Sequence, residues 1–327
     1  MNRDNIVAVI GAGRMGIGIS QVFAYAGYSI RLIDAKKRSD VDTEEVLRSA
    51  CRQISDNLYF LASLGLFDES LVGSILKRIN YYNLKELEEA TAEADIVFEA
   101  VPEVLTIKEE IYKIISSNAN EKAIIASTTS TFLADTLAQY VNDPERFLNT
   151  HWLNPAYLVP LVEVSPGNNT STDTLERMIS LLENVGKVPV KCAASPGFIV
   201  PRIQALAMNE AARLVEEGVA TPEEVDKASR YGFGIRFAIL GLLEFIDWGG
   251  GDILFYASQY LKGTVDAERF EAPSIISENM ANGNIGMKTG KGFYDFTDRN
   301  ISQYQKETIK KFVDLLKHMG LLIAPQK

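Results

Sequence analysis

The pattern of hydrophobic and polar positions changes once along the chain, at Ser195-Pro196-Gly197. Before this point, short apolar runs alternate with longer segments whose apolar residues recur every three or four positions. That pattern predicts strands alternating with helices. After it, only the helical period is found. We therefore expect an α/β fold, a doubly wound sheet over residues 1–193, followed by an all-helical domain over residues 194–296.

The apolar runs predict strands, and the segments between them predict helices. We expect a helical hairpin inserted after the second strand, with Asp42 or Thr43 capping a helix that reaches Ser63 and Asp68 opening a second helix. The expected strands cover residues 6–10, 29–33, 95–101, 122–127, 147–150, 159–164 and 188–191.

In the second region, we expect a helix from about Phe198 to Glu217, ended by Gly218. Thr221 should cap the next helix. The tail, residues 297–327, carries a last amphipathic helix that we expect to pack on the body or on a partner subunit.

A glycine-rich turn joins the first strand to the helix that follows it. Gly11 permits a tight turn, Gly13 lets a pyrophosphate approach the backbone, and Gly16 lets the helix pack closely on the strand. The helix N-terminus attracts phosphates. The turn therefore predicts a Rossmann dinucleotide-binding domain, with Arg14 and Met15 beside the cofactor.

Asp34 ends the second strand, about 20 residues after the turn, where an acid hydrogen-bonds an adenosine ribose. Its charge would repel a 2′-phosphate, so we predict NAD as the cofactor. Arg31 and Lys36 are basic neighbours that weaken this preference for NAD over NADP.

Composition narrows the class of partner. The 327 residues carry a net charge of −10, which argues against nucleic acid or an anionic membrane as a general partner. Cys51 and Cys192 are read as buried thiols of a reducing cytoplasm. Met1–Asp4 lead straight into the first strand and leave no room for a signal peptide. No apolar run has the length of a membrane span.

One histidine follows a predicted strand, the edge at which α/β sheets bind ligands. This is His151, and Glu163 is the one charge in the next apolar run. A carboxylate buried in a sheet needs a partner, and an imidazole would serve. The pair would orient the ring and stabilise its charged form. The alternatives are a structural histidine and a glutamate at a strand edge facing water.

From residue 5 to 296 the chain resembles the NAD-dependent L-3-hydroxyacyl-CoA dehydrogenases. The shared features are the glycine turn, the helical hairpin, and four ordered motifs. These motifs are Glu99-Ala100-Val101-Pro102-Glu103 with Lys108, Ala126-Ser127-Thr128-Thr129-Ser130, His151-Trp152-Leu153-Asn154-Pro155 with Glu163, and Lys288-Thr289-Gly290-Lys291-Gly292-Phe293-Tyr294.

The resemblance implies roles for these residues. His151 would be the general acid/base and Glu163 its partner, with Ser130 and Asn154 near the reacting oxygen and the nicotinamide. The cofactor would also contact Ala100, Glu103 and Lys108. For Glu103 and Lys108, a surface ion pair at helical spacing is an equally good interpretation of the sequence.

Three departures from the acyl-CoA enzymes concern the substrate. Pro201 stands where they carry an asparagine near the substrate carbonyl. The hairpin offers few cations for CoA phosphates: Arg48 and Arg52. Where they read G-x-P-M-G-P-x-E, this chain has residues 234–244 with Arg236, which could anchor a carboxylate. This looks more like the branch that acts on free hydroxy acids, such as the gulonate and carnitine dehydrogenases. A structural Arg236 that caps a turn is the alternative.

The sequence therefore predicts a cytoplasmic oxidoreductase that interconverts an L-3-hydroxyacyl group and the 3-ketone, with NAD and without a metal. The substrate is a short 3-hydroxyacyl-CoA of fatty acid metabolism or, alternatively, a free 3-hydroxy acid. A non-catalytic dinucleotide-binding protein would not need His151, Glu163 and Ser130 together. The 6-phosphogluconate-like dehydrogenases use a catalytic lysine instead. By analogy we expect a homodimer formed through the helical domain.

Overall fold

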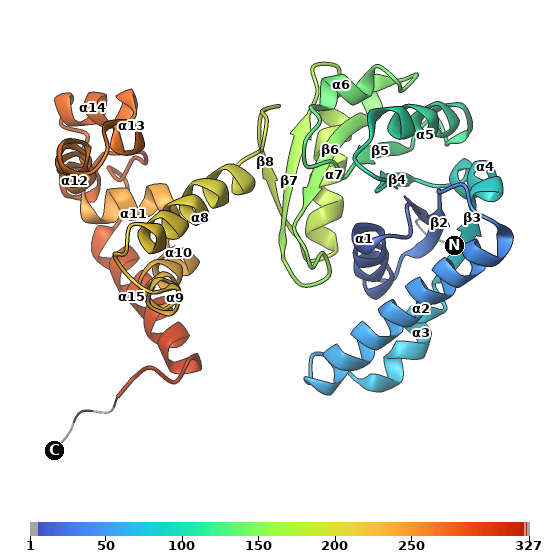
Figure 1. Ribbon diagram of the computed structural model, residues 1–327, viewed down its shortest axis with the longest axis horizontal. Coiled ribbons are helices and arrows are strands. Elements are labelled where there is room, and N and C mark those ends of the chain that lie inside the picture. Colours follow the sequence, from blue (N-terminus) through green and yellow to red (C-terminus); the bar gives the residue numbers. More distant parts are fainter. Residues whose placement is uncertain (1–5, 324, 326–327) are drawn as a thin grey trace. The chain divides into compact units, whose positions relative to one another are not determined.

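The computed structural model describes residues 6–323 and 325, so Met1–Asn5 and residues 324, 326 and 327 of the predicted tail lie outside the description. The chain separates into two compact units, Met1–Leu206 and Ala207–Lys327 (Figure 1). Their boundary falls inside helix α8 (Val200–Glu216). The domain limits expected at residues 193/194 and 296/297 stay predictions.

The described part of the first unit contains an eight-stranded sheet with the order β3-β2-β1-β4-β5-β6-β7-β8. Neighbouring strands are parallel, except that β6 and β7 pair antiparallel. This sheet, followed by a helical region, confirms the predicted fold class. The strands are β1 (Ile6–Ile10), β2 (Ser29–Asp34), β3 (Ile79–Asn83), β4 (Ile96–Glu99), β5 (Ile124–Ser127), β6 (Phe147–Trp152), β7 (Leu161–Pro166) and β8 (Val188–Lys191).

Helices cover both faces of this sheet. One hydrophobic cluster joins it to α1 (Arg14–Tyr25), α2 (Asp40–Ser63), α3 (Val72–Leu76) and α7 (Thr172–Asn184), and the other to α4 (Leu87–Ala92), α5 (Leu105–Asn118) and α6 (Ala134–Ala138). Strand β1 sends Val7 and Val9 into the first cluster and Ala8 and Ile10 into the second. A strand that is buried on both faces has a continuous run of apolar residues in its sequence, as β1 does.

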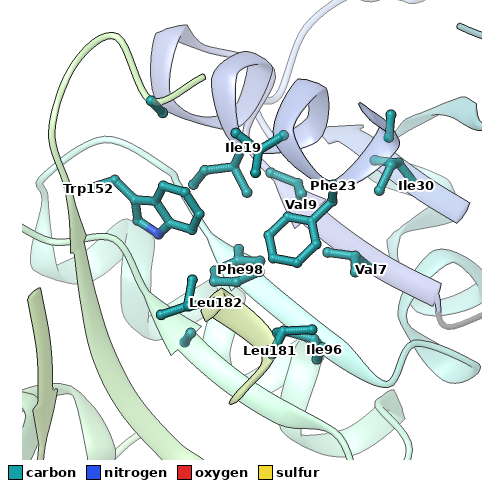
Figure 2. Packing of buried hydrophobic residues seen from close by; sticks show 14 of the residues in the cluster. Val7, Val9, Ile19, Phe23, Ile30, Ile96, Phe98, Trp152, Leu181 and Leu182 are labelled. Atoms are coloured by element: carbon teal, nitrogen blue, oxygen red, sulfur yellow. The ribbon is translucent and has the colours of Figure 1, made fainter. Parts of the chain in front are cut away.

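Three aromatic rings form the centre of the first cluster, as Figure 2 shows. Phe23 of α1 lies 5.3 Å from Phe98 of β4, measured between ring centroids, and Phe98 lies 5.8 Å from Trp152 of β6. Trp152 directly follows His151 in β6. The core therefore fixes the strand that carries this histidine.

The sequence predictions missed one strand of this unit and misplaced the start of one helix. Strand β3 was missed because its sequence mixes polar and apolar residues, as suits an edge strand that pairs only with β2. Helix α2 begins at Asp40 rather than after Asp42 or Thr43. The hydroxyl of Ser39 accepts the N–H of Asp42 and caps the helix.

The named elements among the described residues of the second unit are helices, joined by loops that contain isolated β-bridges at Gly286–Lys291 and Lys291–Asp295. Gly218 has a φ of 71° after α8, and the Thr221 hydroxyl accepts the N–H of Glu224, as the sequence predicts. No helix among the residues described is long and apolar enough to cross a membrane. The further α-helices of the second unit are α9 (Pro222–Ala228), α10 (Ile235–Ile239), α11 (Leu242–Gly249), α12 (Gly251–Thr264), α13 (Ala267–Phe270), α14 (Ser274–Ala281) and α15 (Ile301–His318).

The closing glycine motif of the sequence shapes this second unit. Buried Asp247 of α11 accepts the backbone N–H groups of Phe293 and Tyr294 at 3.0 and 2.8 Å. A Cβ on Gly292 would lie 2.1 Å from the Asp247 carboxylate, so only glycine fits there. In α15, the Tyr304 hydroxyl contacts the Glu244 carboxylate of α11.

Candidate active site

A cleft of about 990 Å³ opens at the carboxyl ends of β1, β2 and β4 in the first unit. This is the edge at which open α/β sheets bind ligands. Of the predicted cofactor residues, the cleft is lined by Gly11, Gly13, Arg14, Met15, Asp34 and Ala100, whereas Gly16, Glu103, Lys108 and Ser130 are not among the lining residues.

The three glycines of the turn meet different surroundings. Gly11 has a φ of 122°, and a Cβ there would lie 2.4 Å from the Ala100 carbonyl oxygen. A Cβ on Gly16 would lie 1.8 Å from the Gly11 carbonyl oxygen, inside the packed turn. Around Gly13, the N-cap of α1, no atom beyond its own local backbone and its chain neighbours lies within 4 Å of the Cβ position. This open helix N-terminus fits a pyrophosphate.

Asp34 lies at the end of β2 with an exposure of 4%. Its Oδ2 accepts the Nε–H of Arg38 at 3.0 Å, and its Oδ1 accepts the N–H of Lys36. Arg31 points elsewhere and forms a 2.6 Å ion pair with Glu93. Sequence reasoning therefore named the wrong arginine.

His151 and Glu163 are register partners across β6 and β7. The Nδ1 atom of His151 lies 2.6 Å from Oε2 of Glu163, and the two residues are 5% and 0% exposed. The predicted end of the strand at Thr150 was wrong, because pairing with β7 extends β6 to Trp152. A glutamate at a strand edge facing water is excluded, since β7 lies between β6 and β8.

The second oxygen of Glu163 receives two backbone donors. Oε1 accepts the N–H groups of Ile199 and Val200 at 2.7 and 2.8 Å, where α8 begins. A carboxylate at a helix N-terminus satisfies donors that have no partner within the helix. Glu163 thus joins the His151 ring to the start of α8, with donors on both of its oxygens.

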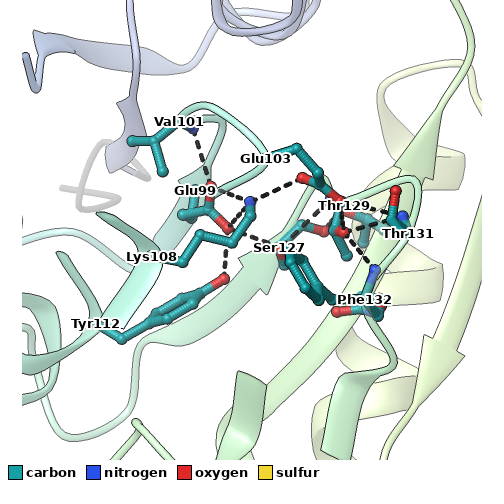
Figure 3. A network of polar contacts seen from close by, with 11 residues as sticks. Glu99, Val101, Glu103, Lys108, Tyr112, Ser127, Thr129, Thr131 and Phe132 are labelled. Carbon is teal, nitrogen blue, oxygen red and sulfur yellow. Dashed lines mark hydrogen bonds and ion pairs between the residues drawn. The ribbon is translucent and has the colours of Figure 1, made fainter. Parts of the chain in front are cut away.

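A second buried glutamate lies at the end of β4, as Figure 3 shows. Glu99 contacts the Lys108 ammonium at 2.8 and 2.9 Å, the Tyr112 hydroxyl at 2.5 Å and the Ser127 hydroxyl at 2.7 Å. It also accepts the N–H of Val101. Burial and the nearby carboxylate raise the pKa of Tyr112 well above its ordinary value. The sequence analysis placed Glu99 in a family motif but gave it no role.

Lys108 links this network to Glu103. Its side chain is 1% exposed and lies 3.2 Å from a Glu103 oxygen, while Glu103 also accepts the Thr129 hydroxyl and the N–H of Thr131. Partial burial opposes ionisation of Glu103, but these hydrogen bonds and the lysine charge together lower its pKa. A surface ion pair is therefore the wrong interpretation for Lys108. The network ties the loop after β4 to the loop after β5 (Figure 3).

Comparisons with known proteins decide the family. The model described as "3-hydroxyacyl-CoA dehydrogenase, NAD binding domain" matches residues 6–195, and the C-terminal domain of the same family matches residues 197–296. The chain belongs to the 3-hydroxyacyl-CoA dehydrogenase family. The resemblance expected from the sequence motifs is confirmed, and NAD is the cofactor of this family's N-terminal domain.

Relatives of this dehydrogenase match nearly end to end. A probable 3-hydroxybutyryl-CoA dehydrogenase of Bacillus subtilis is 32% identical, over 90% of this chain and 98% of the relative. A 5-formyl-3-hydroxy-2-methylpyridine 4-carboxylate 5-dehydrogenase of Mesorhizobium japonicum is 28% identical, over 94% and 96%. The solved 3-hydroxyacyl-CoA dehydrogenase of Archaeoglobus fulgidus superposes with a TM-score of 0.75 at 30% identity, over 97% and 99%.

The other predicted site residues of this dehydrogenase lie in three places. Ser130 and Asn154 are exposed and follow β5 and β6, which are neighbours in the sheet. Arg236 is exposed on α10 in the second unit, with its guanidinium carbon 5.6 Å from the centre of the Phe245 ring. This is a cation–π contact within the second unit. The binding of a carboxylate by Arg236 stays a prediction.

Sequence reasoning missed Lys187, a buried lysine beside the loop that follows β6. Its ammonium donates to the carbonyl oxygens of Ala156 and Val159 at 2.6 and 2.8 Å. Burial lowers the pKa of Lys187 to about 8. No sequence motif marks this lysine, because its partners are backbone atoms.

The two thiols predicted to be buried, Cys51 and Cys192, are only half-buried.

Proposed function

We propose that this protein is an NAD-dependent dehydrogenase that interconverts the L-3-hydroxyacyl group of a short 3-hydroxyacyl-CoA and its 3-ketone. The observation that carries the proposal is the 2.6 Å contact between His151 Nδ1 and Glu163 Oε2. Because Glu163 occupies Nδ1, the ring has Nε2 for proton transfer. A positioned imidazole supplies about 10²–10⁴-fold of rate in such transfers.

His151 takes the hydroxyl proton of the substrate at Nε2, and Glu163 stabilises the positive charge that results. A bound NAD would supply the acceptor for the hydride that leaves C3 of the substrate. Ser130 and Asn154 orient the reacting oxygen and the nicotinamide. Asp34 would hold the adenosine ribose of a bound NAD. The dinucleotide site on the glycine turn and the loop after β4 would be formed or supported by Gly11, Gly13, Arg14, Met15, Gly16, Ala100, Glu103 and Lys108.

A second candidate is a dehydrogenase of a free 3-hydroxy acid. The Mesorhizobium relative is named for a substrate with a free carboxylate. Pro201 lies in the first turn of α8 and has no side-chain amide for a thioester carbonyl. The exposed guanidinium of Arg236 could bind a carboxylate with two hydrogen bonds.

A panel of NADH-consumption assays separates the two candidates. Acetoacetyl-CoA should be reduced far more efficiently than free 3-keto acids such as dehydrocarnitine if the main proposal holds. If a free acid is the substrate, Arg236→Ala should raise its KM by about 10- to 150-fold, and Arg236→Lys should raise it less. In both cases NAD should be preferred over NADP, and equal efficiency would contradict the role given to Asp34.

We also propose that residues 194–296 form the substrate and dimerisation domain of a cytoplasmic homodimer, with residues 297–327 packed on it. Helix α12 exposes Ile253, Tyr256 and Tyr260 by 62%, 63% and 69%, at a spacing that places them on one face. Light scattering after size-exclusion chromatography should give twice the mass of the chain. A Tyr256→Glu, Tyr260→Glu variant should give the mass of one chain.

A further inference from the structure

Phe198 has an uncommon backbone conformation. Its φ is 46°, and no other non-glycine residue among those described has a positive φ. The left-handed region costs a residue with a Cβ about 1–3 kcal/mol, and glycine would avoid this cost. An aromatic side chain at such a position therefore suggests that the ring itself serves a purpose.

The ring of Phe198 stacks on the ring of His151. The two centroids are 4.8 Å apart and the ring planes differ by 4°. Phe198 is 6% exposed, yet in the part of the chain described it belongs to neither hydrophobic cluster of the sheet domain. Its burial is thus directed at the histidine rather than at the core.

The backbone around Phe198 serves the same pair. The chain turns at Gly197 and Phe198, and the next two N–H groups, those of Ile199 and Val200, point at Glu163 Oε1. One short segment therefore places a ring on the face of His151 and two donors on the carboxylate that holds its edge. Together these contacts fix both the plane and the rotation of the imidazole.

We propose that Phe198 is a positioning residue for His151. This inference rests on the proposed function, in which the imidazole gains a proton and a positive charge as hydride leaves the substrate. The face of an aromatic ring carries negative charge and attracts a cation over it. Phe198 thus favours the imidazolium form as well as the orientation in which Nε2 meets the hydroxyl.

Histidine-observed NMR tests this directly, because the chain has only two histidines, His151 and His318. His318→Ala in the tail helix leaves one imidazole signal. We expect that signal to be shifted upfield by the ring current of Phe198, to lose the shift in Phe198→Leu and to keep it in Phe198→Tyr. If the His151 signal is not shifted upfield in the His318→Ala protein, which still carries Phe198, the proposal is overturned.

Kinetics supply the second readout. Phe198→Leu should lower kcat by about 2- to 30-fold, leave the KM for NAD unchanged, and shift the pH profile of kcat. Phe198→Tyr should restore both kcat and the pH profile. Equal losses in both variants with an unchanged pH profile would reduce Phe198 to a structural residue. An active His151→Ala variant would instead overturn the proposed function.

Discussion

Two buried glutamates lie in the same sheet, and their partners differ in a way that explains their uses. Glu99 at the end of β4 faces the ammonium of Lys108, and Glu163 in β7 faces the imidazole of His151. Both glutamates are 0% exposed. As residue types, a lysine side chain is a cation over the physiological pH range, whereas a histidine side chain can gain or lose a proton within it.

The two glutamates also differ in whether their partner is accessible. Lys108 is as buried as Glu99, so neither can reach a substrate, and their hydrogen bonds join two loops (Figure 3). His151 retains 5% exposure at the carboxyl end of β6. Burying a charge is costly unless it is paired. The fold thus uses one buried pair to hold the cofactor loops and the other, in our proposal, to move a proton.

The largest expected effect is on turnover. His151→Ala should lower kcat by about 10²–10⁴-fold, because it removes the positioned acid/base. NADH should still bind, since the cleft lies on other residues; fluorescence titration measures this. His318→Ala is the matched control and should keep wild-type turnover. If His151→Ala keeps most of the wild-type activity, this histidine has a structural role and not a catalytic one.

The next effect concerns stability. Lys108→Met should leave Glu99 as a buried carboxylate without its cation, a change that costs about 3–5 kcal/mol. At about 2–4 °C per kcal/mol, the unfolding temperature should fall by roughly 6–20 °C. Lys113→Met, which removes an exposed ion pair with Glu109 one turn further along α5, is the control and should change little. Calorimetry of both variants decides whether the network holds the loops.

The smallest effect comes from a buried lysine with no ion-pair partner among the described residues. The pKa of Lys187 falls from 10.5 to about 8 on folding because of burial. Between these values the unfolded chain binds the proton and the folded chain does not, so the contribution of Lys187 to stability rises with pH. Relative to Lys187→Met, the wild-type free energy of unfolding should rise by about 1 kcal/mol per pH unit at most.

Urea unfolding at pH 7, 8.5 and 10 measures this difference. A difference between the wild type and Lys187→Met that is independent of pH would show that the lysine keeps its charge in the fold.

Local signals in the sequence were enough to predict the glycine turn, an acid at the end of β2 and the contact between His151 and Glu163. Each depends on a short segment: a turn that needs glycine, or a single charge in an apolar run. The sequence could not show that β7 runs antiparallel to β6, which places His151 directly opposite Glu163. Register across strands depends on tertiary packing that no short segment encodes.

Other features were missed for similar reasons. Glu99 reads as an ordinary strand end, and its partners Lys108, Tyr112 and Ser127 come from two other elements. Phe198 was expected to begin a helix, but α8 begins at Val200 and the left-handed backbone of Phe198 has no sequence signal. Residues whose role depends on a distant partner or on an unusual conformation become visible only in three dimensions.

The most direct test compares the two glutamates by the same substitution, measuring kcat and unfolding temperature for Glu163→Gln and Glu99→Gln. In Glu163→Gln the new amide can donate to Nδ1 of His151 and so place the proton on Nε2, the wrong tautomer for a base. We predict a loss of turnover on the order of tenfold or more, smaller than for His151→Ala, with a shifted pH profile. Glu99→Gln should lower the unfolding temperature and keep the kcat of the folded enzyme. Unchanged turnover in Glu163→Gln, with the larger loss of kcat in Glu99→Gln, would contradict the account.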